Sequence, residues 1–147
     1  MDIVPLPKAG VNAMIGLLEI LDDAGGKDDV DRLASNIQFE LDELLPITEG
    51  TEKLGFVTVD AGDITLTPLG KQFLEADVNQ RKLIFRQALK TIAIFQQVIA
   101  VLKARQQHRM ERDFFLDLFQ ERLSPAEAEA LLKHLINWGR YGELLGY

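Results

Sequence analysis

The chain has no cysteine and few of the other side chains that serve as nucleophiles and bases. Without cysteine there are no disulfides, no thiol nucleophile and no cysteine metal ligands. Its 2 histidines, His108 and His134, fall in different predicted helices, where we expect both on the surface. Of the serines, Ser124 fits a helix cap, and Ser35 lacks both a histidine nearby and a Gly-x-Ser-x-Gly turn. We therefore expect no catalytic residue, no cofactor and no metal, and we predict that the chain is not an enzyme.

Phosphate-binding loops and long apolar runs are also missing. Neither Gly-x-x-x-x-Gly-Lys-Ser/Thr nor Gly-x-Gly-x-x-Gly occurs, so we predict no P-loop for ATP. The aspartate-rich residues 22–31 lack the alternating spacing of an EF-hand loop. The most apolar stretch, residues 91–102, is interrupted by Gln96 and Gln97 and is shorter than the roughly 20 residues that span a bilayer. No basic region leads into an apolar run near the N-terminus, which argues against a secretory signal and favours a cytoplasmic protein.

Charge is unevenly distributed along the chain, whose net charge is −7. Residues 1–78 contain 5 Lys/Arg and 16 Asp/Glu, a net charge of −11, whereas residues 79–147 contain 11 Lys/Arg and 7 Asp/Glu, a net charge of +4. The change of sign indicates a domain boundary near Val78. Two interpretations stay open: the halves attract each other or a charged partner, or they are two solvated surfaces of unlike composition.

The most informative local pattern is a predicted β-hairpin that runs directly into a helix. Residues 56–59 predict a strand, residues 60–63 a turn and residues 64–66 a second strand. Thr67 and Pro68 then predict a helix start, with a hydroxyl cap followed by proline at the first helical position.

Helical patterns fill most of the remaining sequence. They cover residues 11–24, a segment from Asp28 or Asp29 to Asn36, a segment from Phe39 or Glu40 to Leu54 that Pro46 either bends or delays, residues 68–76, residues 79–106, residues around 110–119, and a last helix from the capping box at Ser124. Two helices followed by a two-stranded wing are the layout of a winged helix-turn-helix. We therefore predict a mainly α (α+β) fold, with a winged helix in residues 1–78 and a helical extension in residues 79–147.

The predicted long helix over residues 79–106 carries two apolar stripes, which implies burial on more than one side. Either the following C-terminal helices cover both stripes, or one stripe contacts another subunit or protein. The candidate partner-binding residues combine these stripes with the aromatic tail: Ile84, Phe85, Phe95, Ile99, Leu102, Trp138 and Tyr141.

A winged helix raises the question of DNA binding. The predicted recognition helix carries Glu40, Asp42, Glu43, Glu49 and Glu52 against Lys53 alone, a net charge of −4. The wing adds aspartates and no cation. Because DNA binding depends on cations that neutralise phosphates, this charge argues against nucleic acid as the partner.

Four short motifs together resemble the AAA-associated C-terminal domain found after the ATPase module of ABC transporters similar to those for nitrate, sulfonate and taurine. They are Leu-Gly-Phe at residues 54–56, Leu-Thr-Pro-Leu-Gly at residues 66–70, Gln-Arg-Lys at residues 80–82 and Trp-Gly-Arg-Tyr at residues 138–141. The resemblance implies a non-catalytic accessory or regulatory domain whose partner is an ABC-type ATPase. It also implies a place at the inner face of the membrane through that partner. The ATPase module itself is not in this sequence.

Two alternatives to this function stay open at this stage. One is a winged-helix DNA-binding transcription regulator, which the acidic recognition helix disfavours. The other is a self-associating scaffold domain, a homodimer with the helix from Ile84 to Leu102 at its seam.

Overall fold

The structure is a computed structural model that describes residues 3–36, 40–106 and 110–145. The chain divides into two compact units, each described separately below. The N-terminal unit is Pro7–Arg81, and the C-terminal unit is Lys82–Tyr147 together with Met1–Leu6. The sequence placed the boundary a few residues earlier, at residue 78.

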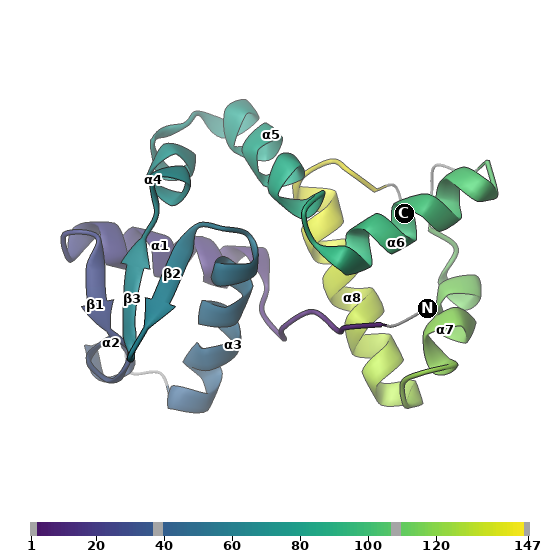
Figure 1. The fold of residues 1–147 in the computed structure, drawn as a ribbon, viewed down its shortest axis with the longest axis horizontal. Coiled ribbons are helices and arrows are strands. Elements are labelled where there is room, and N and C mark those ends of the chain that lie inside the picture. Colours follow the sequence, from purple (N-terminus) through teal and green to yellow (C-terminus); the bar gives the residue numbers. More distant parts are fainter. Residues whose placement is uncertain (1–2, 37–39, 107–109, 146–147) are drawn as a thin grey trace. The chain divides into compact units, whose positions relative to one another are not determined.

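The described residues form eight helices and three strands, labelled in Figure 1. The N-terminal unit contains α1 (Val11–Asp23), β1 (Lys27–Asp29), α2 (Val30–Asn36), α3 (Leu41–Lys53), β2 (Val57–Asp60), β3 (Asp63–Leu66) and α4 (Pro68–Glu75). The later helices are α5 (Val78–Leu89), which crosses the boundary, α6 (Ala93–Ala104), α7 (Arg112–Gln120) and α8 (Pro125–Tyr141). This is a mostly helical α+β chain, as predicted.

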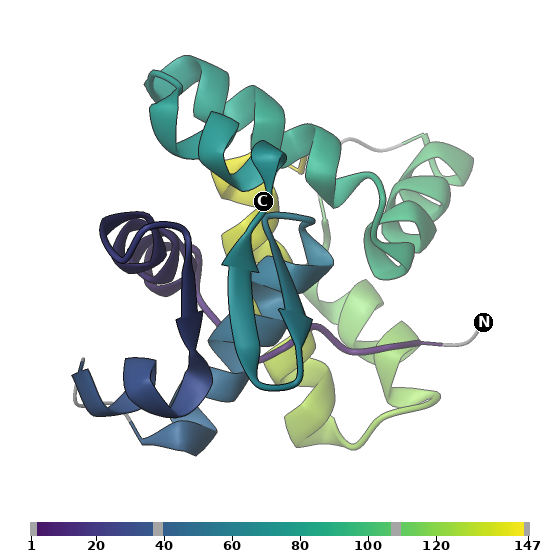
Figure 2. The same ribbon diagram turned by 60° about the vertical axis from the view of Figure 1, so that its left-hand side comes forward.

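The predicted hairpin is confirmed. β2 and β3 pair antiparallel, with Val57 opposite Leu66 and Asp60 opposite Asp63. The two turn residues, Ala61 and Gly62, have φ of 50° and 85°, the positive values that a tight I′-type hairpin turn requires. Figure 2 shows the face of the hairpin, with β1, the third strand of the sheet, beside it.

The sequence missed β1. It placed the start of a helix at Asp28 or Asp29, but both residues belong to β1, which pairs antiparallel with β3. A Lys-Asp-Asp segment has low strand propensity, and only the partner strand makes it a strand. Asp29 nevertheless caps α2, because its Oδ1 accepts the amide hydrogens of Asp31 at 2.9 Å and Arg32 at 3.2 Å.

α3 begins at Leu41 and continues through Pro46, so the late start that proline could have imposed does not occur. The buried side of this helix carries Leu44, Ile47 and Thr51. The aromatic core of the N-terminal unit lies elsewhere, where Phe56 and Phe73 stack with ring centroids 4.8 Å apart.

The single helix predicted over residues 79–106 is wrong, because α5 and α6 are separate helices bent by 90° at the break. Thr91 closes α5: its amide and its hydroxyl both donate to the carbonyl of Ala88, at 3.1 and 2.7 Å. Ile92 is extended, with φ −92° and ψ 127°, and precedes α6. Two consecutive β-branched residues, one with a hydroxyl that bonds the preceding turn, are a local reason for the break.

α8 begins as predicted. The hydroxyl of Ser124 accepts the amide hydrogen of Glu127, and the Glu127 carboxylate accepts that of Ser124, which completes the capping box. α8 buries Leu131, Leu135 and Trp138, and it packs against α7 in the C-terminal unit.

Candidate interaction surfaces

The seven residues predicted to bind a partner all lie in the C-terminal unit, and none is exposed. Phe85, Phe95, Leu102 and Trp138 are buried, while the other three, Ile84, Ile99 and Tyr141, are half-buried. Contacts within the chain account for much of this burial. The rings of Phe95 in α6 and Trp138 in α8 stack with centroids 6.5 Å apart, and the rings of Phe85 in α5 and Tyr141 are perpendicular with centroids 4.8 Å apart. A partner contact at these residues stays a prediction.

Gly142 and Glu143, which follow α8, are held on α5 by polar contacts. Arg86 Nε donates to the carbonyl of Gly142 at 2.7 Å, and Lys82 Nζ donates to Glu143 Oε1 at 2.9 Å. Glu143 has a φ of 54°, so the chain reverses there, and the amide of Leu144 returns to the carbonyl of Gly139. The hydrogen bond from Lys82 lowers the pKa of Glu143 below its usual value. The described residues after α8 are therefore packed against α5 and the end of α8.

The residues of the four short motifs have structural roles in this chain. The hydroxyl of Thr67 accepts the amide hydrogen of Gly70 at 3.0 Å and donates to the carbonyl of Gly55 at 2.7 Å. Arg81 donates to the carbonyls of Phe73 and Leu74, and its guanidinium lies 5.3 Å from the centre of the Phe73 ring. These contacts join the hairpin to α4 and satisfy carbonyls at the end of α4.

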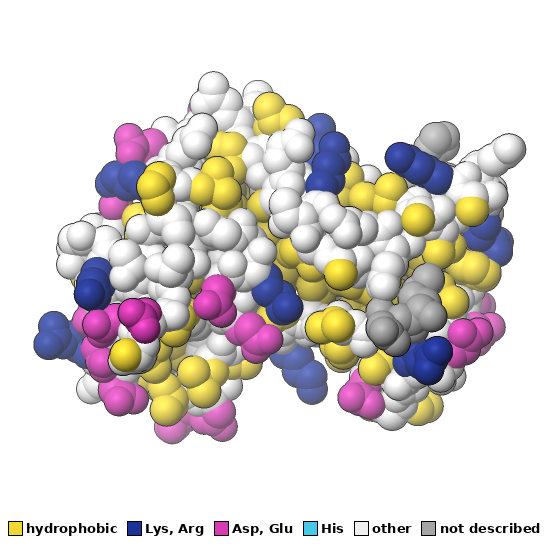
Figure 3. Space-filling model, viewed as in Figure 1, with side chains coloured by type: hydrophobic (Ala, Val, Ile, Leu, Met, Phe, Trp, Pro, Cys, Tyr) yellow, Lys and Arg dark blue, Asp and Glu magenta, His cyan; other side chains and the backbone are white. Residues whose placement is uncertain are grey.

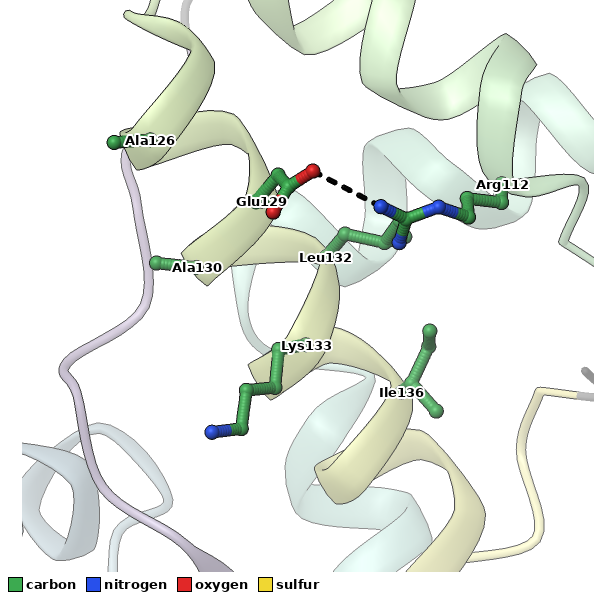
Figure 4. Close-up of a pocket in the computed structure, with 7 residues that line it drawn as sticks. All are labelled: Arg112, Ala126, Glu129, Ala130, Leu132, Lys133 and Ile136. Carbon is green, nitrogen blue, oxygen red and sulfur yellow. Dashed lines mark hydrogen bonds and ion pairs between the residues drawn. The ribbon is translucent and has the colours of Figure 1, made fainter.

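A hollow of about 570 Å³ lies on α8 beside the start of α7, and Figure 4 shows its lining. Arg112 and Glu129 are paired across it at 2.9 Å, and both side chains are more than half exposed. Alanine, leucine and isoleucine side chains and Lys133 supply the rest of the lining. The lining offers contact surface rather than a nucleophile with a base beside it.

A second hollow, of about 390 Å³, lies in the N-terminal unit at the start of α4. Its cation, Lys71, donates to Asp22 of α1 at 2.6 Å, and this hydrogen bond raises the pKa of Lys71. The charge of Lys71 is therefore already compensated from within the unit. The hollow lies where α1 and α4 are linked by this ion pair, and its described lining residues offer no uncompensated cation to bind an anion.

The solvent side of α3 exposes leucine side chains together with carboxylates. Leu41 and Leu45 are 41% and 48% exposed. Glu49 and Glu52 are exposed further along the helix. We call these four residues the α3 face. Figure 3 shows hydrophobic side chains at the surface where α3 begins, at the lower left, with acidic side chains beside them.

No ion pair found among the described residues involves the α3 carboxylates. The α3 face therefore presents uncompensated negative charge next to exposed leucine. Such a surface repels phosphates and suits an apolar surface with cations at its border.

Within the described ranges, no group of three His, Asp or Glu side chains is placed to hold a metal ion. Nδ1 of His134 lies 2.7 Å from the carbonyl oxygen of Ala130, one turn earlier in α8, and His108 lies outside the described residues. No single helix of the described part is long and apolar enough to cross a bilayer. α5 and α6 reach that length and composition only when taken together across their bend.

The sequence profile of the C-terminal AAA-associated domain matches residues 31–147. The chain belongs to this family. The matched region begins in α2 and includes α3, the hairpin and all the later helices, so the α3 face and the hollow on α8 both fall within the family region. Neither the search of curated proteins nor the search of solved structures found a significant match. The description of the AAA-associated domain indicates association with an ATPase, in agreement with the resemblance found in the four motifs.

The α3 face was not predicted from the sequence. At about 100° per residue, Leu41 and Leu45 lie about 60° and 100° round the helix from the buried Leu44, so they occupy the arc that adjoins the buried one rather than the opposite side. Because the buried Thr48 lies between Leu41 and Leu44 in this projection, the helical pattern alone does not separate the exposed leucines from the buried ones.

Proposed function

We propose that this chain is a non-catalytic accessory domain that binds an ABC-type ATPase and shifts the balance between the conformations of that ATPase. Membership of the C-terminal AAA-associated domain family carries this proposal. The four motifs support a transporter ATPase of the nitrate, sulfonate or taurine kind as the partner. Acting through that partner would put the domain in the cytoplasm, at the inner face of the membrane.

The N-terminal unit is, in this proposal, a winged helix-turn-helix used for protein contacts. α2 and α3 correspond to the helix-turn-helix pair, and the β2–β3 hairpin corresponds to the wing. α3 takes the place of the recognition helix, yet its exposed side carries leucines and carboxylates. This composition supports a protein partner over DNA.

A domain of this kind changes ATPase activity only if it binds one conformation of the ATPase more tightly than another. Each tenfold ratio of affinities shifts the conformational equilibrium by about 1.4 kcal/mol. A domain without a preference would bind and leave the rate unchanged.

The test uses the full chain and a purified ABC-type ATPase of the nitrate, sulfonate or taurine transporter kind. We expect saturable binding in calorimetry and a changed rate of ATP hydrolysis at the same domain concentrations. Light scattering of the chain alone is the control for self-association. Absence of binding together with an unchanged rate would contradict the proposal, and a stable dimer without ATPase binding would favour the scaffold function.

A further inference from the structure

We infer that the α3 face is the surface that binds the ATPase, and that the ATPase presents to it an apolar recess bordered by lysine or arginine. This inference rests on the proposed function and adds to it the docking surface and the chemistry of the partner.

The four residues of the α3 face form a row along the helix. Leu41, Leu45, Glu49 and Glu52 follow one another at intervals of 4, 4 and 3 residues, the spacing at which side chains share one side of a helix. The adjoining side, which carries Leu44 and Ile47, is buried in the N-terminal unit and fixes the rotation of α3. The row is therefore presented outward along the length of the helix.

Within the row, the apolar and the acidic side chains are separated along α3. The leucines occupy the first turns of α3 and the glutamates occupy the last turns. A partner that matches the whole row needs an apolar recess at one end and cations at the other. This is the arrangement by which an amphipathic helix is recognised in a groove, with anchors at i and i+4.

The surroundings of the two exposed leucines are negatively charged. Glu40 and Asp42 are exposed on either side of Leu41 in the chain, and Glu43 is exposed further round the helix, so the first turn of α3 is acidic as well. A recess rimmed by carboxylates would be repelled by this helix, and so would the phosphates of a nucleic acid. Lysine or arginine at the border of the recess relieves the repulsion within α3 and selects the partner.

The test compares variants of the full chain in binding to the purified ATPase subunit. Leu45→Gln removes an apolar anchor, and Glu49→Lys reverses a charge in the same row. The matched controls lie on other helices: Leu83→Gln on α5 changes a leucine that is 50% exposed, and Asp117→Lys on α7 reverses an exposed charge. All four positions are at the surface, so circular dichroism should show the same helix content as the unchanged chain.

We expect Leu45→Gln and Glu49→Lys each to raise the Kd for the ATPase about tenfold or more, as substitutions at interface hot spots do, and the two controls to stay within about twofold. The affinity of the unchanged chain should also fall as salt is added, and Glu49→Lys should flatten that dependence.

The outcomes separate this inference from the proposed function. Equal binding by the unchanged chain and the α3 variants would overturn the docking surface and leave the ATPase as the partner. Absence of ATPase binding by every chain would overturn both. Loss of self-association in the α3 variants, with ATPase binding unchanged, would assign the α3 face to a second copy of the chain and overturn the inference.

Discussion

Replacing Gly70 with alanine tests whether the hairpin and α4 are joined as closely as the structure indicates. A Cβ on Gly70 would overlap the carbonyl oxygen of Phe56 and would lie 2.9 Å from Leu66 Cδ1. The Phe56 carbonyl also accepts the amide hydrogen of Thr67 at 2.9 Å, so it cannot move away without lengthening that bond. The obstacle is backbone rather than the end of a flexible side chain, and the strain cannot be relieved by rotation.

The expected cost follows from three contributions. Overpacking against a fixed neighbour costs up to about 3 kcal/mol. Loss of one backbone hydrogen bond adds about 1 kcal/mol. Alanine recovers about 1 kcal/mol relative to glycine through its helix propensity. We therefore expect Gly70→Ala to lower the free energy of unfolding by about 3 kcal/mol.

Gly16→Ala is the matched control, because it makes the same chemical change in α1 where nothing lies within 4 Å of the added Cβ. Only the propensity gain remains there, so this variant should be stabilised by about 0.5–1 kcal/mol. Urea unfolding followed by circular dichroism measures both changes. If Gly70→Ala were as stable as Gly16→Ala, the close approach of α4 to the Phe56 backbone would be refuted.

Three further predictions concern the C-terminal unit. Gly142→Ala should destabilise it by about 1–3 kcal/mol in urea unfolding, because an added Cβ would lie 3.3 Å from the backbone of Arg86. Ser124→Ala should cost about 1 kcal/mol in the same assay, since it removes the cap of α8, and Ser124→Asp should restore most of the loss. The pKa of Glu143 is lowered by Lys82, so the pair stabilises the fold above the ordinary carboxyl value of 4.5 and loses this effect as pH falls through the lowered pKa. Melting temperatures across that range should fall less steeply with decreasing pH in Glu143→Gln than in the unchanged chain.

The elements that the sequence predicted correctly are those fixed by local chemistry. The hairpin turn needs positive φ at its central residues, and Gly62 supplies it without strain. The caps at Thr67 and Ser124 are bonds between residues three apart, so they are visible in the sequence alone.

The elements that were missed depend on distant parts of the chain. β1 is a strand only because β3 pairs with it, and no property of Lys27, Asp28 and Asp29 predicts that pairing. The break between α5 and α6 had a local signal in Thr91 and Ile92, but the apolar stripes on both sides of it favoured one helix. The partner-binding residues stay a prediction, because large apolar side chains fill a core as readily as they fill an interface. Phe95 and Trp138 illustrate this, since they pack on each other within the chain.

The charge of an exposed helix such as α3 indicates whether it binds DNA or a protein. A protein that binds DNA gains affinity from each phosphate that a cation neutralises, and the affinity falls steeply as salt replaces those contacts. The exposed side of α3 has Glu49 and Glu52 where a reading helix needs cations, and Lys53 alone opposes five carboxylates in and beside the helix. Mixed-sequence duplex DNA at low salt should therefore show no salt-sensitive binding to the chain. A Kd for DNA that rises with salt would mean that cations elsewhere in the chain outweigh α3, and the argument for a protein partner would fail with it.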